Sequence, residues 1–450
     1  MDSIRKLAGL EDSLTDEALA PLKTYKYSSV DKSYISRYIL KHYVLSLSHP
    51  QSTLLRKIED QYNLLLWNAF VELLPLWIAP NMVTLLGFGF IVGNVMLLEI
   101  FMPDLVGPGP SWLYYSFAIG IWMYSTMDNV DGKQARRTGT SSPLGELFEY
   151  DRETPIFQSS LLEVAAMGQG STKLGAFTML IPCLPMFFST WETYHTHTLY
   201  LGYFNGPTEG LIIATSIIIA AGYYGPEIYS RPLADGIGYK EQLGDITFLD
   251  LWVFVLLASF FTAHLPECVY NVVQVRRRKG LPILPIFLEW TSIIVSSVSA
   301  ISWVYSPHSF ILKDNHLVLF AITLCFVFGR MTTKIILAHL TRQPFPYWTV
   351  LITPLIGGAV LVNLPSLGLP AVSASVELWY LWGYLAFAFI AYMHWALYVI
   401  GRITTFLGIN CLTIKHRRPL SNDSILGNVT NSKTQAGYNK PTLDKPVKLN

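Results

Sequence analysis

The stretch MDNVDGKQARRTGTSSPLGELFEYDRE, from Met127 to Glu153, is densely charged and directly follows a strongly apolar run. That run and the other long apolar runs are each close to the roughly 20 residues that cross a bilayer as a helix. The runs are continuous rather than alternating, which disfavours membrane-spanning strands. The chain is 51% hydrophobic and 14% charged, whereas soluble proteins have about 25% charged residues. The sequence therefore predicts an all-α, polytopic membrane protein with a charged segment at a membrane boundary.

Ten transmembrane helices are expected from the apolar runs. They cover residues 75–102, 110–128, 146–168, 175–195, 209–229, 249–272, 283–305, 316–339, 347–364 and 377–402. The third is the most polar, because it contains ELFEYDRETP. Basic clusters follow the second, sixth, eighth and tenth helices, at 133–137, 276–279, 342 and 415–418. Ten helices place all four clusters on one side, so the positive-inside rule predicts that both termini are cytosolic.

The remaining features define the class of protein further. The four cysteines lie far apart and form no CxxC pair, so we expect free thiols rather than disulfides or a zinc site. The net charge of +1 gives no indication of a nucleic-acid partner, and none is expected. Residues 31–44 have the apolar spacing of a helix lying in the membrane interface, or of a cytosolic helix packed on the protein. The polar tail, 419–450, is predicted to be disordered.

Two pairs of acidic residues in the charged stretch have helical spacing. Asp128 and Asp131 are three residues apart and Glu149 and Glu153 are four apart, so each pair shares one face of a helix. If the second and third helices pack together, four carboxylates converge at the boundary, where acids are costly and usually functional. Divalent cations such as Mg²⁺ take oxygen ligands and combine a few carboxylates with a substrate phosphate. The pattern therefore predicts a metal site.

The neighbouring residues fit a diphosphate ligand. Gly132 lets a ligand approach the backbone, and Ala135 keeps that face of the helix shallow. Arg136 offers a planar pair of donors for phosphate. The whole predicts a two-metal site for a diphosphate. The alternative is that these are ordinary helix-end charges, and for Lys133 and Arg137 we prefer that interpretation.

The stretch resembles the signature of the CDP-alcohol phosphotransferases, D-x2-D-G-x2-A-R-x8-G-x3-D-x3-D. The residues that match it in register are Asp128, Asp131, Gly132, Ala135, Arg136 and Gly145. Most of residues 24–415 is similar to the choline/ethanolamine phosphotransferase branch, and most of all to its fungal members. Segments that carry this likeness include PNMVTLLG (80–87) and WETYHTHTLYLGYFNGPTEG (191–210).

The resemblance implies ten helices and two Mg²⁺ or Mn²⁺ ions. It implies that phosphocholine or phosphoethanolamine passes from CDP-choline or CDP-ethanolamine to diacylglycerol, which gives a phospholipid and CMP. It also implies residence in endoplasmic reticulum or Golgi membranes, and a homodimer is kept open as the oligomeric state. The chain then divides into a cytosolic segment (1–73), a catalytic region (74–229), further transmembrane helices (230–405) and a cytosolic tail (406–450).

The resemblance also implies roles for single residues. The metal ligands are Asp128, Asp131, Glu149 and Glu153. Glu153 would also act as the base, and Arg136 would stabilise charge on the phosphate. Substrate contacts fall on Asn81, Thr84, Asp128, Gly132, Ala135, Arg136 and Gly145. Glu192, His195 and Glu209 would lie at the head group or acceptor, or would simply be solvated at the interface.

The sequence departs from the family pattern in two places. Where the family has two aspartates this chain has Glu149 and Glu153, and Tyr150 and Asp151 replace the usual His and Gly. Pro155 follows closely and is expected to disturb a helix interior. Residues 44–65 form an insert without a counterpart in the family. Genuine divergence and misjoined exons would both give this pattern. The second hypothesis is therefore a catalytically impaired member that acts as a scaffold or transporter.

Overall fold

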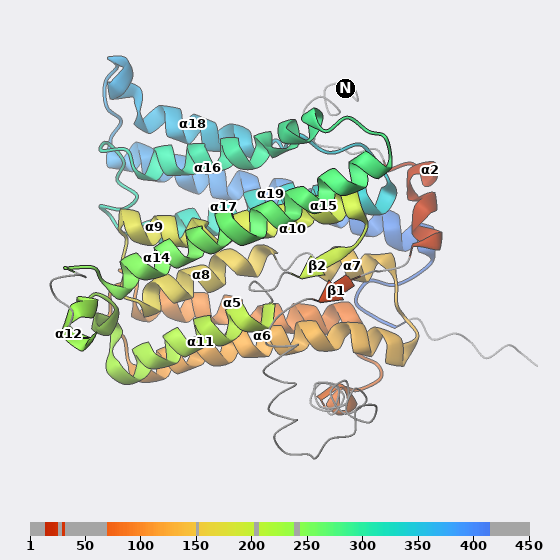
Figure 1. Cartoon of the computed structure of the whole chain (residues 1–450), viewed down its shortest axis with the longest axis horizontal. Helices are drawn as coiled ribbons and strands as arrows, with labels where there is room; N and C mark the ends of the chain where they lie inside the picture. The colour runs from red at the N-terminus through yellow and green to blue at the C-terminus, as the bar shows by residue number, and fades with distance from the viewer. Residues whose placement is uncertain are drawn as a thin grey trace, which may run out of the picture. The chain divides into compact units, whose positions relative to one another are not determined.

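A computed structural model describes residues 14–25, 29–31, 70–149, 153–201, 207–237 and 244–414 (Figure 1). Within these ranges the side chains of 29–31, 148–149, 153–155, 201, 207–209 and 236–237 are not described. The predicted interfacial helix beyond Asp31, the insert at 44–65 and the tail from 415 lie outside the described residues.

Helices make up nearly all regular structure in these ranges. The first half contains α2 (Asp16–Leu19), η1 (Ala20–Thr24), α5 (Pro80–Phe101), α6 (Ser111–Thr138), α7 (Pro143–Glu149), α8 (Glu153–Ala166), α9 (Lys173–Leu180), α10 (Cys183–Thr196) and α11 (Pro207–Tyr224). The second half contains η4 (Pro226–Tyr229), α12 (Leu233–Ile237), α14 (Phe248–Ser259), the π-helical turn η5 (Phe260–His264), α15 (Leu265–Arg278), η6 (Leu284–Trp290), α16 (Thr291–Val304), α17 (Leu317–Thr341), α18 (Ile352–Val362), η7 (Leu364–Leu367) and α19 (Ala374–Leu407). Two short strands, β1 (Ser29–Asp31) and β2 (Leu199–Leu201), pair in parallel.

The prediction of a polytopic α-helical membrane protein is confirmed. Six stretches of the described chain are helices long and apolar enough to cross a membrane. They are Pro80–Phe101, Lys173–Thr196, Phe248–Arg278, Leu284–Val304, Leu317–Thr341 and Ala374–Leu407. Shorter apolar helices lie at Ile156–Ala166, Gly210–Tyr224 and Ile352–Val362, and α6 covers the predicted second segment. A helix or a run of helices thus lies at each of the ten predicted positions.

The third predicted segment is two helices rather than one. α7 ends at Glu149 and α8 begins at Glu153, with 150–152 outside the described residues. Pro155 is therefore the third residue of α8, in the first turn, where a backbone N–H has no partner within the helix. Proline is tolerated there. The expectation that Pro155 disturbs a helix interior is wrong, because the helix starts only two residues before it.

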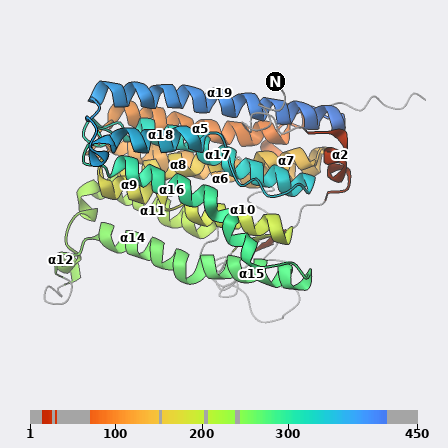
Figure 2. The same cartoon turned by 90° about the horizontal axis from the view of Figure 1, so that it is seen from above.

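α17 is the central helix. It is buried along nearly its whole length and packs against α8, α10 and α19. The rod formed by α14, η5 and α15 is the least buried of the spanning helices and runs along one edge in Figure 2. The exposed apolar side chains of that rod are suited to contact with lipid.

α5 and α6 approach each other closely at two glycines. A Cβ atom on Gly87 would lie 2.8 Å from the Cβ of Met127, and one on Gly120 would lie 2.0 Å from Nδ2 of Asn94. Small residues at helix interfaces in membranes allow such approach of the backbones. The two helices that carry most of the predicted site are therefore packed backbone to backbone.

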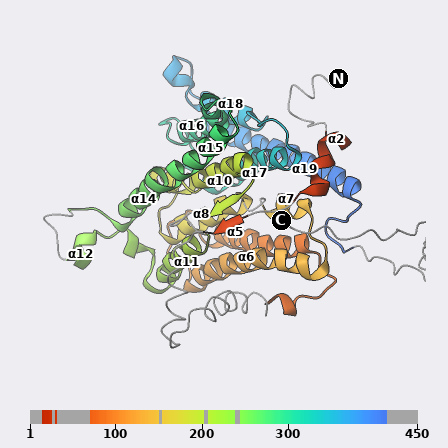
Figure 3. The same cartoon turned by 45° about the vertical axis from the view of Figure 1, so that its right-hand side comes forward.

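The N-terminal segment packs on the helices at one end of the fold (Figure 3). Three leucines between residues 14 and 22 form a buried cluster with apolar residues of α7, α17 and α19. The members are Leu14, Leu19, Leu22, Leu144, Leu147, Ile336, Leu337, Leu340, Trp395, Val399 and Ile403. Arg402 of α19 donates to the carbonyl oxygen of Leu14 at 2.7 Å. Contacts with this N-terminal segment therefore hold α7 against α17 and α19.

The ends of α6, α10, α15 and α17 lie at the same end of the fold (Figure 1). His197, which caps α10, has a lowered pKa because its ring is partly desolvated and because the charges of Lys279 and Arg342 lie near it. Those two residues belong to the basic clusters that follow α15 and α17. The described basic clusters after α6, α15 and α17 therefore lie at one end of the fold (Figure 1).

Candidate active site

The predicted acidic pair lies on one continuous helix. α6 runs ten residues beyond the predicted membrane segment, because Lys, Gln, Ala and Arg all favour helix. It ends at Thr138 and is capped by Gly139, which has a left-handed φ of 65°. Asp128 and Asp131 are 8% and 4% exposed. Both carboxylates are thus buried one helical turn apart, as their spacing predicted.

Thr84 joins α5 to this pair. Its hydroxyl donates to Oδ2 of Asp131 at 2.6 Å, and Oδ1 of Asp131 accepts from the backbone N–H of Gly132. Hydrogen bonds of this kind fix the orientation of a carboxylate that binds a metal. Thr84 of α5 therefore lies directly beside Asp131 of α6.

Asn81 lies one turn earlier on α5 and faces α7. Its Nδ2 donates to the carbonyl oxygen of Cys411 at 3.0 Å. A Cβ atom added to Gly145 would meet only Oδ1 of Asn81, at 4.0 Å, so this face of α7 is open. The start of α5 thus lies between the acidic pair and the segment that carries Gly145.

The arrangement of the helices differs from the expected one. The second and third predicted segments were expected to pack directly on each other. Instead, α7 packs on α5, α17 and α19, and α8 packs mostly on α17 and then on α5, with only a small contact with α6. The side chains of Glu149 and Glu153 are outside the described part, so their predicted convergence stays a prediction. Within the described residues, no group of three or more His, Cys, Asp and Glu could hold a metal ion.

The described donors nevertheless suit a hard divalent ion. Asp128 and Asp131 present carboxylate oxygens from one helical face in a buried position, which is the ligand type that Mg²⁺ and Mn²⁺ prefer. Further ligands would have to come from substrate phosphate, water or the glutamates at the break between α7 and α8.

The two arginines of the charged stretch differ. Arg137 donates to the carbonyl oxygen of Leu74 at 2.9 Å and also to that of Val71, so it holds the residues that lead into α5. Its role is more specific than the helix-end charge that the sequence indicated. Arg136 is exposed and makes no hydrogen bond or ion pair with any residue that the structure describes. Only Arg136 is therefore available to a ligand without breaking contacts.

Gln134 has a structural role that was not predicted from the sequence. Its side chain is fully buried, and Nε2 donates to the carbonyl oxygens of Pro75 at 3.1 Å and Ile78 at 3.0 Å. Together with Arg137, it holds the residues that lead into α5 against the last turns of α6. A glutamine among charged residues gave no sequence signal for this role.

Glu192 and His195 are buried rather than solvated. An oxygen of Glu192 accepts from Nδ2 of Asn271 in α15 at 2.6 Å. Nε2 of His195 lies 2.7 Å from Oε2 of Glu289 in η6. The interpretation as interfacial, solvated side chains is wrong for both, because α10 packs against α15 and η6. The side chain of Glu209 lies outside the described residues.

Two buried basic residues of α17 were also not predicted from the sequence. Arg330 is fully buried in α17 with its guanidinium 5.8 Å from the centre of the Trp395 ring, and Lys334 lies one turn later at 8% exposure. Ionisable residues within membrane helices are rare and usually functional. The run FVFGRMTTKIILAHL carries them within an apolar segment, which was a usable signal.

Comparison with known proteins decides the family. The model of the CDP-alcohol phosphatidyltransferase family matches residues 77–150. Choline/ethanolaminephosphotransferase 1 of Arabidopsis thaliana is 33% identical over 89% of this chain and 97% of its own length. The chain belongs to the CDP-alcohol phosphatidyltransferase family. Members of this family generally use divalent metal ions. The matched residues include Asp128, Asp131 and Glu149 but end before Glu153.

Two fungal relatives are similar over the same length. Cholinephosphotransferase 1 of Saccharomyces cerevisiae is 32% identical over 90% of this chain and 99% of its own length. An uncharacterized CDP-alcohol phosphatidyltransferase class-I family protein of Schizosaccharomyces pombe is 31% identical over 89% of this chain and 97% of its own length. The identities to the fungal and plant proteins are nearly equal, so they do not single out the fungal branch.

Proposed function

We propose that the protein transfers phosphocholine, phosphoethanolamine or both from the CDP-alcohol to 1,2-diacylglycerol, giving phosphatidylcholine or phosphatidylethanolamine and CMP. The observation that carries this proposal is the buried pair of Asp128 and Asp131, with Thr84 hydrogen-bonded to Asp131. Such a pair on a membrane helix suits a diphosphate with its cations. Relatives of the chain bear the names of choline and choline/ethanolamine phosphotransferases.

The proposed metal ligands are Asp128, Asp131, Glu149 and Glu153, which would hold two Mg²⁺ or Mn²⁺ ions. When bound, such a pair of ions neutralises the diphosphate and the charge on departing CMP. Thr84 orients Asp131 for this task through its hydrogen bond. Family resemblance is what assigns the two glutamates.

Two side chains of the protein are proposed to accept the proton and to bind the phosphate. Glu153 is proposed to accept the proton of the diacylglycerol 3-hydroxyl, whose oxygen attacks the β-phosphorus while CMP leaves. Arg136 donates to the β-phosphate, for which its exposed guanidinium needs no rearrangement. The surrounding helices exclude water, which would otherwise hydrolyse the donor.

The remaining substrate contacts are proposed from the positions of the residues in the fold. Asn81 and Thr84 are proposed to contact the nucleotide, and Gly132, Ala135 and Gly145 give it room along α6 and α7. Glu192, His195 and Glu209 are proposed to act at the head group or acceptor. Because Glu192 and His195 are engaged by Asn271 and Glu289, they can reach a substrate only by exchanging these partners.

The test is CMP release from CDP-choline and CDP-ethanolamine by membranes that contain the protein, diacylglycerol and Mg²⁺. Release that requires both diacylglycerol and Mg²⁺ supports the transferase. The glutamates at 149 and 153 favour one alternative, an impaired member that acts as a scaffold or transporter. A properly folded chain that releases no CMP from either donor would support that alternative.

Arg136→Lys should lower kcat/KM about 10-fold, because lysine loses one of two bonds to phosphate and each bond to a charged group contributes about 1.5 kcal/mol or more. The matched control is Arg137→Lys, whose side chain bonds backbone carbonyls rather than substrate. The measurement is steady-state CMP release at varied CDP-choline. Equal kcat/KM for Arg136→Lys and the unchanged chain would remove Arg136 from phosphate binding.

We propose that the protein resides in the endoplasmic reticulum or Golgi membrane with both termini in the cytosol. The described basic clusters after α6, α15 and α17 lie on one side, and positive residues favour the cytosolic side. Tags placed at residues 1 and 450 should therefore both be digested by protease added to sealed microsomes. Protection of either tag, with digestion after detergent, would contradict this topology.

A further inference from the structure

α7 is the short helix that carries Gly145 and ends at Glu149. Helices shorter than about 12 residues are marginal on their own, so contacts with neighbours must set the position of this one. On its apolar side, Leu144 and Leu147 are buried against α17 and α19. On its polar side Glu146 is buried at 5% exposure. Burial of an acid at this place needs a specific polar environment.

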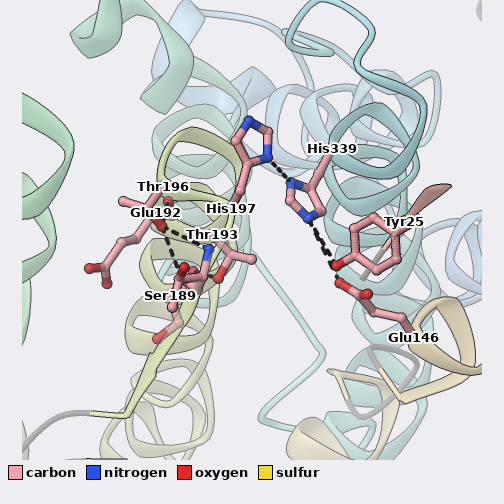
Figure 4. A network of polar contacts seen from close by, with 9 residues as sticks. Tyr25, Glu146, Ser189, Glu192, Thr193, Thr196, His197 and His339 are labelled. Atoms are coloured by element: carbon pink, nitrogen blue, oxygen red, sulfur yellow. Dashed lines mark hydrogen bonds and ion pairs between the residues drawn. The ribbon is translucent and has the colours of Figure 1, made fainter. Parts of the chain in front are cut away.

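His339 supplies part of that environment. It lies in the last turn of α17, and its Nε2 is 3.8 Å from Oε1 of Glu146 (Figure 4). The same nitrogen is 3.4 Å from the hydroxyl oxygen of Tyr25, whose ring stands edge-on to the imidazole at 5.9 Å. Three segments far apart in the chain thus meet at one ring nitrogen.

The other nitrogen of His339 is held separately. Nδ1 lies 3.0 Å from Nδ1 of His197, and the two rings are stacked with centres 4.9 Å apart. One of these two nitrogens carries the proton between them. The pairing fixes the plane of the His339 ring, and so it directs Nε2 toward Glu146 and Tyr25.

We infer that Tyr25, His339 and Glu146 are positioning residues that set the place of α7 and of the metal-binding carboxylate at its end. In this role they need no contact with the reacting atoms. They act as outer partners of the site, as hydrogen-bonded groups do around metal ligands. This inference rests on the proposed function only in its assignment of Glu149 as a ligand.

The experiment measures Mn²⁺ affinity of the purified full chain by electron paramagnetic resonance, which does not need turnover. Glu146→Ala and His339→Asn should each weaken Mn²⁺ binding about 10-fold or more, the range seen when outer partners of metal ligands are lost. His339→Gln should retain most of the affinity. The amide of glutamine reaches as far as Nε2, whereas the amide of asparagine reaches only to the position of Nδ1.

Tyr25→Phe provides a milder variant that keeps the ring, and it should weaken Mn²⁺ binding less than Glu146→Ala does. Its matched control is Tyr305→Phe, which removes a hydroxyl that donates to the carbonyl oxygen of Lys173 and should leave Mn²⁺ affinity unchanged. In the transfer assay, Glu146→Ala should raise the Mg²⁺ concentration for half-maximal rate, with kcat recovering at saturating Mg²⁺. A role in packing alone would not produce that separation.

Unchanged Mn²⁺ affinity in folded Glu146→Ala and His339→Asn would overturn the inference. So would equal affinity of His339→Asn and His339→Gln, because a polar group at the position of Nε2 would then make no difference to Mn²⁺ binding. An unchanged chain that binds no Mn²⁺ would overturn it as well. A chain that binds Mn²⁺ but releases no CMP would instead refute the proposed function and leave the positioning role measurable.

Discussion

Asp128→Ala and Asp131→Ala should each reduce CMP release by about 10²–10³-fold or more, because each removes charge stabilisation from a diphosphate. Both carboxylates are buried on one face of α6. The measurement is the rate of CMP release at saturating CDP-choline and Mg²⁺, with Mn²⁺ affinity measured in parallel.

The matched control is Asp314→Ala, which removes an exposed carboxylate in the loop before α17. Its rate should equal that of the unchanged chain. If either variant of the acidic pair kept more than half of the rate at saturating Mg²⁺, the pair would not be the metal site.

Rebuilding residues 149–159 with the family's Asp-His-Gly context should raise kcat about 10²-fold. The extra methylene of Glu149 and of Glu153 moves each carboxylate, and a displacement of about 1 Å can cost about 10²-fold in rate. Mg²⁺ also requires near-ideal octahedral geometry. The chain with its present glutamates should therefore be weakly active in the CMP assay, with a slower but measurable release of CMP.

Changing only Glu149 and Glu153 to Asp should restore part of this activity, because Tyr150 and Asp151 remain in place of His and Gly. Pro155 is not the obstacle, since it lies in the first turn of α8. Glu72→Asp, at an exposed glutamate, is the control for the substitution itself. A present chain as fast as a typical relative would show that the site accepts glutamate and that ligand geometry was misjudged.

The helices were predictable because continuous apolar runs of bilayer length have few other structures available. The end of α6 was less predictable. The polar residues after 128 mark the end of the predicted membrane segment, but the helix itself continues to Thr138. The break between Glu149 and Glu153 was hidden for a similar reason. The local sequence is polar but contains no residue that forbids a helix before Pro155.

The acidic pair was predictable from spacing alone, since three residues bring side chains to the same helix face. The partners of Glu192 and His195 were not. Asn271 and Glu289 are 79 and 94 residues away in the chain, and only the packing of α10 on α15 and η6 brings them together. The resemblance named Thr84, but its bond to Asp131 depends on how closely α5 and α6 approach.

Because α5 and α6 approach so closely, the geometry of the site depends on the absence of a side chain at Gly87. Gly87 lies one turn after Thr84, and its contact with Met127 lies immediately before Asp128. A single methyl group at residue 87 would act as a spacer between the two helices, although it would touch no ligand, carboxylate or phosphate. The distance over which Thr84 reaches Asp131 is therefore set by a missing side chain. An inventory of chemically active residues alone would overlook this part of the site.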